Sequence, residues 1–392
     1  MKRLLILILK FSFLISYSQS NTEIYVFDLN ISKNTISITN PINISNNKGY
    51  DSQPFFEGDN QLIFSSNRNG QTDIATYDIN TKTKRFYSNT AIGSEYSPQP
   101  VPGLKHKTAV RLDTTGLQRL YIYRSKPIRT IIKNFKVAYY TWFDENTIVS
   151  AVIENDSLNL FTTFLKDHKS RKYAKNVGRS FHKIPNTKLV SFISKENPNQ
   201  WQIKSLNPLT GETKFITNTI ENSEDLCWLN DGSILMTQKN QIFISNPSKG
   251  KDWTILKSFK DNRFQNLTRI ATNLANNRLA LVSEMTPENI VQQQLDTYNN
   301  RDIEGFSKVF SEDVKIYEFP NTLLYDGKTA MKARYKKLFE DTPDLNSTIQ
   351  SRIIQGNTVI DHEYITANGR NFTIVAIYEV NDGQITKATF IR

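Results

Sequence analysis

Cysteine and histidine are scarce in this chain of 392 residues. The sequence contains one cysteine, Cys227, and four scattered histidines, His106, His168, His182 and His362. A single thiol excludes an intramolecular disulfide, so side-chain packing must stabilise the fold. Cys227 precedes Trp228 in an apolar run, which is typical of a buried small residue rather than of a nucleophile. Scattered histidines predict no metal site, because zinc needs ligands at short fixed spacings.

The motifs of several common enzyme classes are also absent. The sequence has no G-x-S-x-G run, which excludes the nucleophile elbow of an α/β-hydrolase. Gly327-Lys328-Thr329 lacks the upstream glycine of a phosphate-binding P-loop, because Thr322 stands at that position. No EF-hand spacing occurs either. We therefore predict neither a metal nor a cofactor.

Positive charge is in excess but unevenly distributed. The formal net charge is +11, whereas residues 286–392 hold 12 Lys and Arg against 15 Asp and Glu, a net of −3. Residues 1–285 therefore carry +14. Their positive residues are scattered and form no basic stripe, so we predict no nucleic-acid partner. A solvated basic surface and an anionic envelope polymer as partner both stay open.

The first residues are typical of a secretory signal peptide. Lys2 and Arg3 precede an apolar stretch over residues 4–15, and Ser16-Tyr17-Ser18 offers a small-x-small cleavage site. A membrane anchor is the alternative, but the stretch is short for a span and Lys10 interrupts it. We predict that residues 1–18 are removed near Ser18 and that the protein is exported, to a periplasm or out of the cell.

Six strand-like runs recur along the first three quarters of the chain. Their central apolar residues lie 50, 46, 40, 43 and 39 residues apart. These residues are Ile24, Ile74, Leu120, Leu160, Ile203 and Ile242. A strand-only repeat of about 40–50 residues is the period of a β-propeller blade. Because one blade cannot bury its own apolar face, we predict a closed six-bladed propeller over residues 21–285.

The two ends of this region each supply half a blade. Residues 267–273 and 278–282 form two strand-like runs, after which the repeat stops. Residues 24–29 and 35–39 look like a third and a fourth strand without a first and a second. Joining residues 21–45 to residues 265–283 would complete the last blade and remove both open sheet edges.

One phrase of the repeat resembles a known family. Tyr50-Asp-Ser-Gln-Pro54 recurs as Tyr96-Ser-Pro-Gln-Pro100, and Phe64-Ser-Ser-Asn-Arg-Asn-Gly-Gln-Thr-Asp-Ile74 follows the first copy. This pattern resembles the TolB-like (PD40, WD40-like) propeller repeat. Propellers bind and scaffold many partners, and the fold by itself names no reaction.

Contacts with a partner are expected at the mouth of the propeller channel, on the loops that enter the inner strands. Polar and aromatic candidates on these loops are Tyr50, Glu95, Tyr96, Arg179, His182, Glu224 and Asp225. The alternative is structural, since tyrosine and proline at these places can wedge neighbouring blades together.

The character of the sequence changes at residue 286. Thr286 is a predicted helix N-cap with Pro287 at the first helical position, and Asn289 stands where a capping box would have Glu. Apolar residues then recur at helical spacing. We predict helices from about 287, 303 and 327, a strand at 314–319, and strands at 347–355, 358–366, 371–380 and 384–391. Helices before an antiparallel sheet indicate an α+β domain over residues 286–392.

Four segments of this domain carry a second resemblance. They are Val291-Gln-Gln-Gln-Leu-Asp-Thr-Tyr-Asn-Asn-Arg-Asp302, Phe310-Ser-Glu-Asp-Val314, Tyr325-Asp-Gly-Lys-Thr-Ala330 and Ala376-Ile-Tyr-Glu-Val-Asn-Asp-Gly383. They resemble the SnoaL-like branch of the nuclear transport factor 2 (NTF2) superfamily. The resemblance implies an α+β cone around an apolar pocket. Relatives include ketosteroid isomerases, polyketide cyclases and non-catalytic or dimerising members.

The resemblance also implies site residues. The position of the isomerase base falls on Glu318, whereas the two oxyanion donor positions fall on Gln294 and Ala376, which weakens that chemistry. Asp361 and Glu363 alternate on one strand and should share a face. With Tyr298, these residues are the candidates for lining the pocket. An alternative is that the acids sit on a solvated rim or pair with arginines.

Two functions follow from these observations. The first is an exported, non-catalytic binding or scaffold protein, whose propeller docks a protein or polymer and whose C-terminal domain holds a small apolar ligand or forms a homodimer. The alternative is an isomerase or lyase of the ketosteroid-isomerase type with Glu318 as general base.

Overall fold

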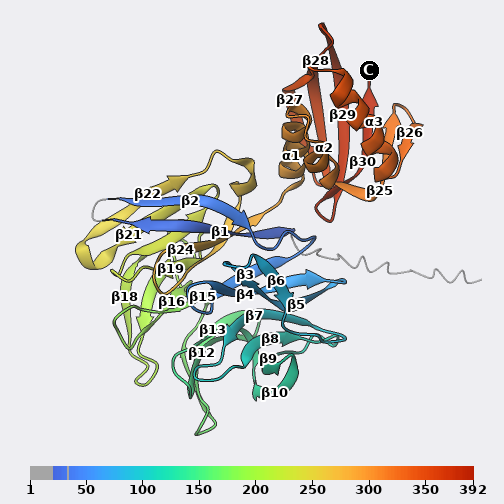
Figure 1. The fold of residues 1–392 in the computed structure, drawn as a ribbon. Coiled ribbons are helices and arrows are strands. Elements are labelled where there is room, and N and C mark those ends of the chain that lie inside the picture. The colour runs from blue at the N-terminus through green and yellow to red at the C-terminus, as the bar shows by residue number, and fades with distance from the viewer. Residues whose placement is uncertain (1–20, 33–34) are drawn as a thin grey trace, which may run out of the picture.

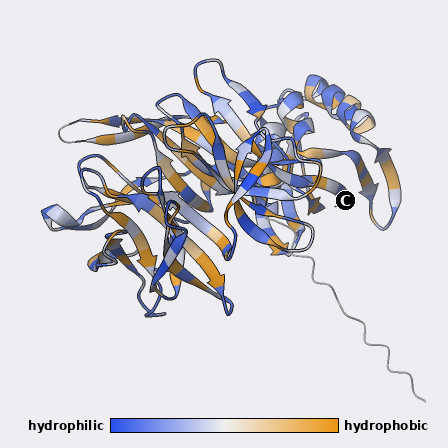
Figure 2. Ribbon diagram, turned by 90° about the horizontal axis from the view of Figure 1, so that it is seen from below, coloured by the Kyte–Doolittle hydropathy of each residue, from blue (hydrophilic) through white to orange (hydrophobic). Residues whose placement is uncertain are grey.

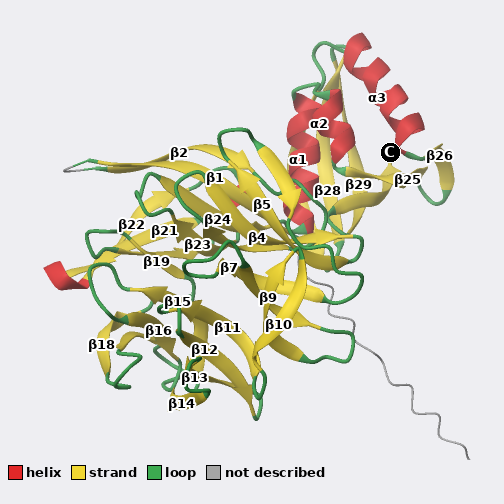
Figure 3. Ribbon diagram, turned by 60° about the horizontal axis from the view of Figure 1, so that its bottom comes forward, coloured by secondary structure: helices red, strands yellow, loops and turns green. Residues whose placement is uncertain are grey.

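The computed structural model describes residues 21–32 and 35–392 (Figure 1). The predicted signal peptide, residues 1–18, lies outside the described residues. Within them, no helix has both the length and the apolar character needed to cross a membrane. The chain forms a strand-built repeat region (residues 21–285) and a C-terminal domain (residues 286–392) that carries the α-helices of the described chain (Figure 3).

The described part of the repeat region folds into six antiparallel sheets of four strands each. The first three are β3 (Asp51–Phe56), β4 (Gln61–Arg68), β5 (Gln71–Asp78) and β6 (Thr83–Phe86); β7 (Ser94–Pro100), β8 (Lys107–Leu112), β9 (Gln118–Arg124) and β10 (Lys126–Ile132); and β11 (Lys136–Trp142), β12 (Thr147–Glu154), β13 (Ser157–Phe164) and β14 (Lys169–Ala174).

The other three sheets follow the same order. They are β15 (Val177–Lys183), β16 (Val190–Ser194), β17 (Gln202–Leu206) and β18 (Thr213–Asn218); β19 (Leu226–Trp228), β20 (Ile234–Gln238), β21 (Gln241–Asn246) and β22 (Lys251–Ser258); and β23 (Leu267–Thr272), β24 (Arg278–Glu284), β1 (Thr22–Ile31) and β2 (Ile36–Asn43). Short 3-10 helices at Pro247–Lys249 and Asn262–Phe264 interrupt the connections.

The sixth sheet joins strands from both ends of the repeat region. Its order is β2-β1-β24-β23, and Ile24 lies opposite Val282. The two faces of β1 are both buried, because Tyr25 and Phe27 pack with the fifth sheet while Ile24 and Val26 pack with the first. At about 1.5–3 kcal/mol for each buried side chain, these four side chains of β1 together stabilise the fold by roughly 6–12 kcal/mol, before the entropy cost of ordering them is subtracted.

Neighbouring sheets pack face to face through separate apolar clusters. One cluster joins Ile63 of the first sheet to Tyr123 of the second, and another joins Leu62 of the first sheet to Ala280 of the sixth. Similar clusters fill the other four boundaries among the described residues. Figure 2 shows the result, with apolar residues concentrated on the strands and polar residues on the loops.

The C-terminal domain is one curved sheet with three helices. Its elements are α1 (Pro287–Asn299), α2 (Ile303–Lys308), β25 (Phe310–Glu318), β26 (Thr322–Asp326), α3 (Lys328–Asp341), β27 (Asn346–Gln355), β28 (Thr358–Ala367), β29 (Arg370–Asn381) and β30 (Gln384–Ile391). The sheet order is β26-β25-β30-β29-β28-β27, and only the β25–β30 pair is parallel. The α+β class is thus as predicted, while β26 is an additional strand.

A capping box starts α1. Thr286 Oγ1 accepts a hydrogen bond from the Asn289 backbone N–H at 3.3 Å, and Asn289 Oδ1 accepts one from the Thr286 N–H at 3.0 Å. Pro287 occupies the first turn, where no backbone donor is needed. Asn289 therefore performs the part that Glu or Gln usually takes at this position.

The two parts are joined closely. Only Met285 and Thr286 separate β24 from α1, and the Met285 N–H donates to the Asn21 carbonyl at 2.8 Å. Lys308 Nζ donates to Asn46 Oδ1 at 2.7 Å across the junction. Asn21 also lies against Gly383, where an added Cβ would clash with its side chain. Glycine at this hairpin therefore permits the close approach of the two parts.

Candidate binding cavity of the repeat region

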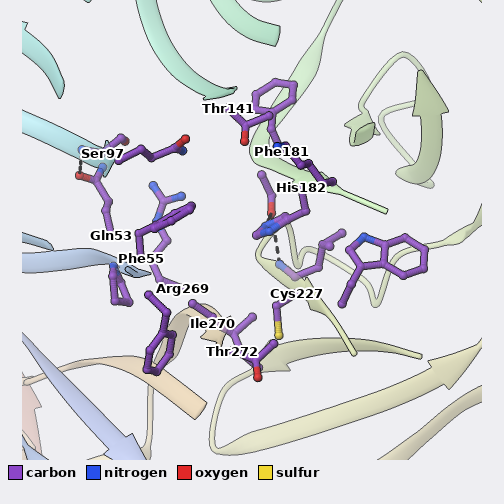
Figure 4. A pocket seen from close by; sticks show the side chains of 18 of the residues that line it. Gln53, Phe55, Ser97, Thr141, Phe181, His182, Cys227, Arg269, Ile270 and Thr272 are labelled. Carbon is purple, nitrogen blue, oxygen red and sulfur yellow. Dashed lines mark hydrogen bonds between the residues drawn. The ribbon is translucent and has the colours of Figure 1, made fainter. Parts of the chain in front are cut away.

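A cavity of about 600 Å³ lies where the first strands of all six sheets meet. Side chains from β3, β7, β11, β15, β19 and β23 line it (Figure 4). The labelled residues are Gln53, Phe55, Ser97, Thr141, Phe181, His182, Cys227, Arg269, Ile270 and Thr272. A volume of this size is in the usual range for a ligand pocket. The cavity exists only because strands from across 220 residues of sequence converge.

Two arginines share one carboxylate in this cavity. Arg179 Nε donates to Asp225 Oδ1 at 3.0 Å, and Arg179 Nη2 donates to Asp225 Oδ2. Arg269 Nη1 lies 3.2 Å from Asp225 Oδ1. Although burial alone would raise the pKa of the Asp225 carboxyl, the two guanidinium groups hold it below its usual value. Asp225 therefore stays ionised and neutralises one of the two positive charges.

A second carboxylate extends the cluster away from the cavity. Glu224 lies 3.5 Å from Arg179 and 2.6 Å from Lys195 Nζ, which itself sits over the Trp201 ring. Burial acts to lower the pKa of the Arg179 guanidinium, but Asp225 and then Glu224 raise it above its usual value. Arg179 is therefore fixed in place as a permanent cation.

Tyrosines surround the arginine cluster. The Arg269 guanidinium lies 5.3 Å from the centre of the Tyr139 ring, within cation–π range. The rings of Tyr50 and Tyr96 meet edge to face at 6.0 Å. Burial raises the pKa of the Tyr50 hydroxyl, although Arg269 acts in the opposite direction. Tyr50 therefore remains neutral, and this end of the cavity combines cations with aromatic faces.

His182 is a neutral hydrogen-bonding group in the cavity wall. Burial lowers its pKa to about 4, so the ring carries no charge near neutrality. Its Nε2 lies 3.0 Å from Ser180 Oγ, and the Leu226 N–H donates to the same oxygen at 3.3 Å. His182 Nε2 and the Ser180 hydroxyl therefore share one hydrogen bond, whose donor is set by the tautomer of the ring.

Cys227 is confirmed as a buried small residue. Its side chain is 2% exposed, and burial raises the pKa of its thiol well above the usual range. A thiol that stays protonated is a poor nucleophile. Its role in the cavity wall is therefore one of packing.

Of the seven predicted partner-contacting residues, three line the cavity: Arg179, His182 and Asp225. Tyr50, Tyr96 and Glu224 lie beside it through the contacts described above. Glu95 does not belong with them, because it is fully buried between the first and second sheets. There it bonds Thr90 and Arg111, and burial raises its pKa to about 7. A partner cannot reach Glu95, so its expected role as a contact residue is wrong.

Sequence reasoning missed two important residues of the cavity, Tyr139 and Arg269. Both residues lie within inner strands, Tyr139 on β11 and Arg269 on β23, whereas contact residues were expected on the loops that enter such strands. Polar and aromatic side chains on the inner strands themselves are the signal that could have found them. Side chains that alternate along other inner strands, such as Phe55 on β3 and Phe181 on β15, could have been predicted to face the cavity by the same reasoning.

The predicted pocket residues of the C-terminal domain are mostly interior. Gln294, Asp361, Glu363 and Ala376 are each at most 6% exposed, and Tyr298 packs against the core. None of these five lines the central cavity or the groove at the domain junction. Asp361 and Glu363 are both buried, as expected for acids that alternate on one strand face.

The two acids are satisfied by neighbours in the interior. Both oxygens of Asp361 accept from Arg352, at 2.6 and 2.7 Å. Glu363 accepts from Ser347 at 2.8 Å and from the Tyr378 hydroxyl at 3.1 Å, and burial raises its pKa. These contacts are those of structural groups.

Glu318 lies at the end of β25 and is not in this interior. Its side chain is 40% exposed, and its closest charged neighbour is Arg392 at 3.6 Å. The space between helices and sheet instead holds aromatic rings: Phe306 meets Tyr335 at 4.6 Å and Phe310 at 5.0 Å. The buried carboxylates of this domain are therefore Asp361 and Glu363, and the placement of Glu318 is that of a surface residue.

Comparison with known proteins assigns this domain. Residues 291–388 match the family model described as a SnoaL-like domain. The C-terminal domain is SnoaL-like. Solved structures similar to the SnoaL-like domain include an NTF2-like protein of unknown function from Cytophaga hutchinsonii, which is 17% identical over 28% of this chain and 90% of that chain, with a TM-score of 0.25. An uncharacterised cystatin-fold protein from Novosphingobium aromaticivorans is 19% identical over 28% and 99%, with a TM-score of 0.27.

The repeat region is similar to a putative TolB from Agrobacterium tumefaciens. That structure is 11% identical, covers 68% of this chain and 99% of its own, and gives a TM-score of 0.52. At this identity the likeness shows the fold alone, and it confirms the TolB-like resemblance of the repeat. Among curated proteins, no significant sequence match was found.

Proposed function

We propose that the protein is an exported binding protein whose six sheets form one closed six-bladed propeller, and that the central cavity holds its ligand. The sixth sheet supports closure, because it pairs strands from both ends of the repeat region and packs on the first sheet. Export rests on the predicted signal peptide at residues 1–18.

The observation that carries this proposal is the composition of the cavity wall. Six sheets each contribute side chains to one space of about 600 Å³, and that space combines two guanidinium groups, one carboxylate and several aromatic rings. A few convergent polar groups within a largely apolar wall are typical of ligand sites. A purely structural axis would be filled with apolar side chains instead.

For the SnoaL-like domain we propose a non-catalytic role. Its interior is occupied by packed aromatic rings, and its buried acids are bound to Arg352, Ser347 and Tyr378. An isomerase or lyase reaction would require a base beside an enclosed apolar pocket. Glu318 is half-exposed and near Arg392, so this alternative has no geometric support. A small apolar ligand or a homodimer remains compatible with the domain.

A cavity-blocking variant tests the proposal. Thr141 lines the cavity from β11, and its side chain makes no hydrogen bond to another described residue, so Thr141→Trp fills the space with little loss of other contacts. Thr213→Trp on the exposed outer strand β18 is the matched control. The full chain would be screened against a random peptide library on phage and against a glycan array.

Ligands retained by the wild type and the control but lost by Thr141→Trp are expected. If no ligand from either collection depends on an open cavity, the proposed function is wrong. Circular dichroism of the three proteins would check that both variants remain folded.

A further inference from the structure

We propose that the ligand of the central cavity is an extended acidic peptide segment, whose carboxylates bind the arginines at one end of the cavity and Lys183 at the other. This inference rests on the proposed function and specifies its ligand. Three features of the cavity point to it: an excess of positive charge, unpaired strand edges and the spacing of the cations.

The cavity wall carries more positive than negative charge. Arg179, Arg269 and Lys183 line it, whereas Asp225 is the one carboxylate among its lining residues. Because His182 is neutral near pH 7, the lining has a net charge of about +2. Charges in an enclosed site interact strongly with a ligand of opposite sign. An anionic ligand is therefore favoured over a neutral or cationic one.

The two arginines are held in place by Asp225 and still have N–H groups that Asp225 does not use. Each guanidinium has five N–H groups; Asp225 accepts from two N–H groups of Arg179 and forms an ion pair with Arg269. The pairing with Asp225 and the Tyr139 ring fixes their orientation without a ligand. A carboxylate that enters the cavity can thus bind preorganised donors, which lowers the entropy cost of binding.

The strand edges around the cavity favour a peptide over a small anion. Each lining strand, β3, β7, β11, β15, β19 and β23, is the terminal strand of its sheet. One edge of each strand is therefore without a ladder partner. Side chains occupy some of its backbone groups, such as the N–H groups of Ser97 and Leu226, whereas no neighbouring strand pairs with the others. An extended backbone can use such groups, as in recognition by strand addition. Phe55 and Phe181 supply apolar surface between them.

The cations are spaced as an extended chain would require. Arg179 and Lys183 are four residues apart on β15, which is roughly 13 Å along a strand. Lys183 is exposed at its end of the cavity, and burial of its stem lowers its pKa. Within the described residues its ammonium group makes no hydrogen bond or salt bridge, although the more distant carboxylate of Asp144 acts to raise its pKa. A segment of about five extended residues with an acidic side chain at each end would span the two sites, and both acids would then point to the same side.

The test uses the peptides selected on the full chain. Clones that bind the wild type and not Thr141→Trp would be sequenced and synthesised, and their affinities measured by calorimetry. We expect Asp or Glu in every cavity-dependent peptide. Replacing each acid of the peptide by Asn or Gln should weaken binding at least tenfold, and this measurement needs no change in the protein.

Two variants locate the contacts on the protein. Lys183→Gln removes an exposed cation without a partner and should weaken the acidic peptide about fivefold. Arg269→Gln should weaken it more than tenfold, whereas Lys214→Gln on the outer strand β18 is the matched control and should have no effect. Raising the salt concentration should weaken binding to the wild type and change little for the two cavity variants.

The outcomes separate this inference from the function on which it rests. Cavity-dependent peptides without acids, or peptides whose Asn and Gln versions bind equally well, overturn the inference and leave the binding function in place. Cavity-dependent glycans without any peptide have the same consequence. The absence of any cavity-dependent ligand in both collections overturns the binding function itself.

Discussion

The two parts of this protein treat the space at their centre in opposite ways. In the repeat region the apolar faces of each sheet pack against the neighbouring sheets, and the strand edges at the centre face a cavity of about 600 Å³. In the SnoaL-like domain a single curved sheet is covered by helices, whose aromatic rings fill the concave side. The difference shows that an assembly of separate sheets keeps an open centre, whereas one sheet with its own helices can close over it.

The two parts also differ in how their buried charged side chains are paired. In the repeat region the lining of the cavity has two guanidinium groups and one carboxylate, because Arg179 and Arg269 share Asp225. In the SnoaL-like domain Asp361 depends on one arginine, Arg352, and is 1% exposed. The first arrangement leaves N–H donors available for a ligand. In the second, Arg352 satisfies both oxygens of Asp361.

The largest expected effect concerns the filled interior. Phe306 is fully buried and packs against Phe310, Tyr335 and Phe339. Phe306→Ala should lower the free energy of unfolding of the SnoaL-like domain by about 3–5 kcal/mol, because it leaves a cavity. Denaturant unfolding of the full chain measures this, with exposed Phe372→Ala as the control. A loss below about 1 kcal/mol would mean that the interior is not packed as described.

The second prediction sets one buried ion pair against a shared one. Arg352→Met strands the Asp361 carboxylate in the interior and should cost about 3–5 kcal/mol of unfolding free energy. Arg179→Met leaves Asp225 with Arg269 and should cost less. The double variant Arg352→Met with Asp361→Leu should recover most of the loss. Equal costs for the two single variants would contradict the comparison.

The smallest predicted effect is a pH dependence in the repeat region. Burial raises the pKa of Glu95 to about 7, so the folded protein keeps this carboxyl protonated at pH values where the unfolded chain has lost the proton. The contribution of Glu95 to stability is therefore greatest below about pH 4.5 and falls as the pH rises to about 7.

The variant Glu95→Gln should remove this part of the pH profile. The difference in unfolding free energy between wild type and variant, measured by denaturant titration from pH 4 to 8, should change by on the order of 2 kcal/mol. Glu196→Gln, which changes an exposed glutamate, is the control. A difference that does not vary with pH would show that Glu95 is ionised in the folded protein.

Much of the fold could be predicted from local patterns. The six apolar residues that define the repeat, from Ile24 to Ile242, all lie on the third strand of a sheet and are all fully buried. The helices and strands of the SnoaL-like domain were located to within a few residues. The exception is β26, whose residues Thr322–Asp326 are mostly exposed and show no alternation of apolar and polar side chains.

The candidate site was harder to predict. Glu95 is the second residue of the inner strand β7 and Asp225 directly precedes the inner strand β19, and their sequences do not distinguish them. Glu95 lies at 0% exposure between two sheets, whereas Asp225 meets arginines from two other strands. Arg179 and Arg269 are 90 residues apart, so no local pattern connects them. Glu318 matched a position in a family, but its exposure depends on where β25 ends.

The repeat period and the division into two parts followed from the sequence alone, because these depend on apolar periodicity and turn residues between neighbours in the chain. Only the tertiary structure decided which charged side chains meet at the centre and which are sealed inside. That decision depends on the relative placement of strands from distant segments, and it alone sets the burial, the ion pairing and hence the chemistry of each group.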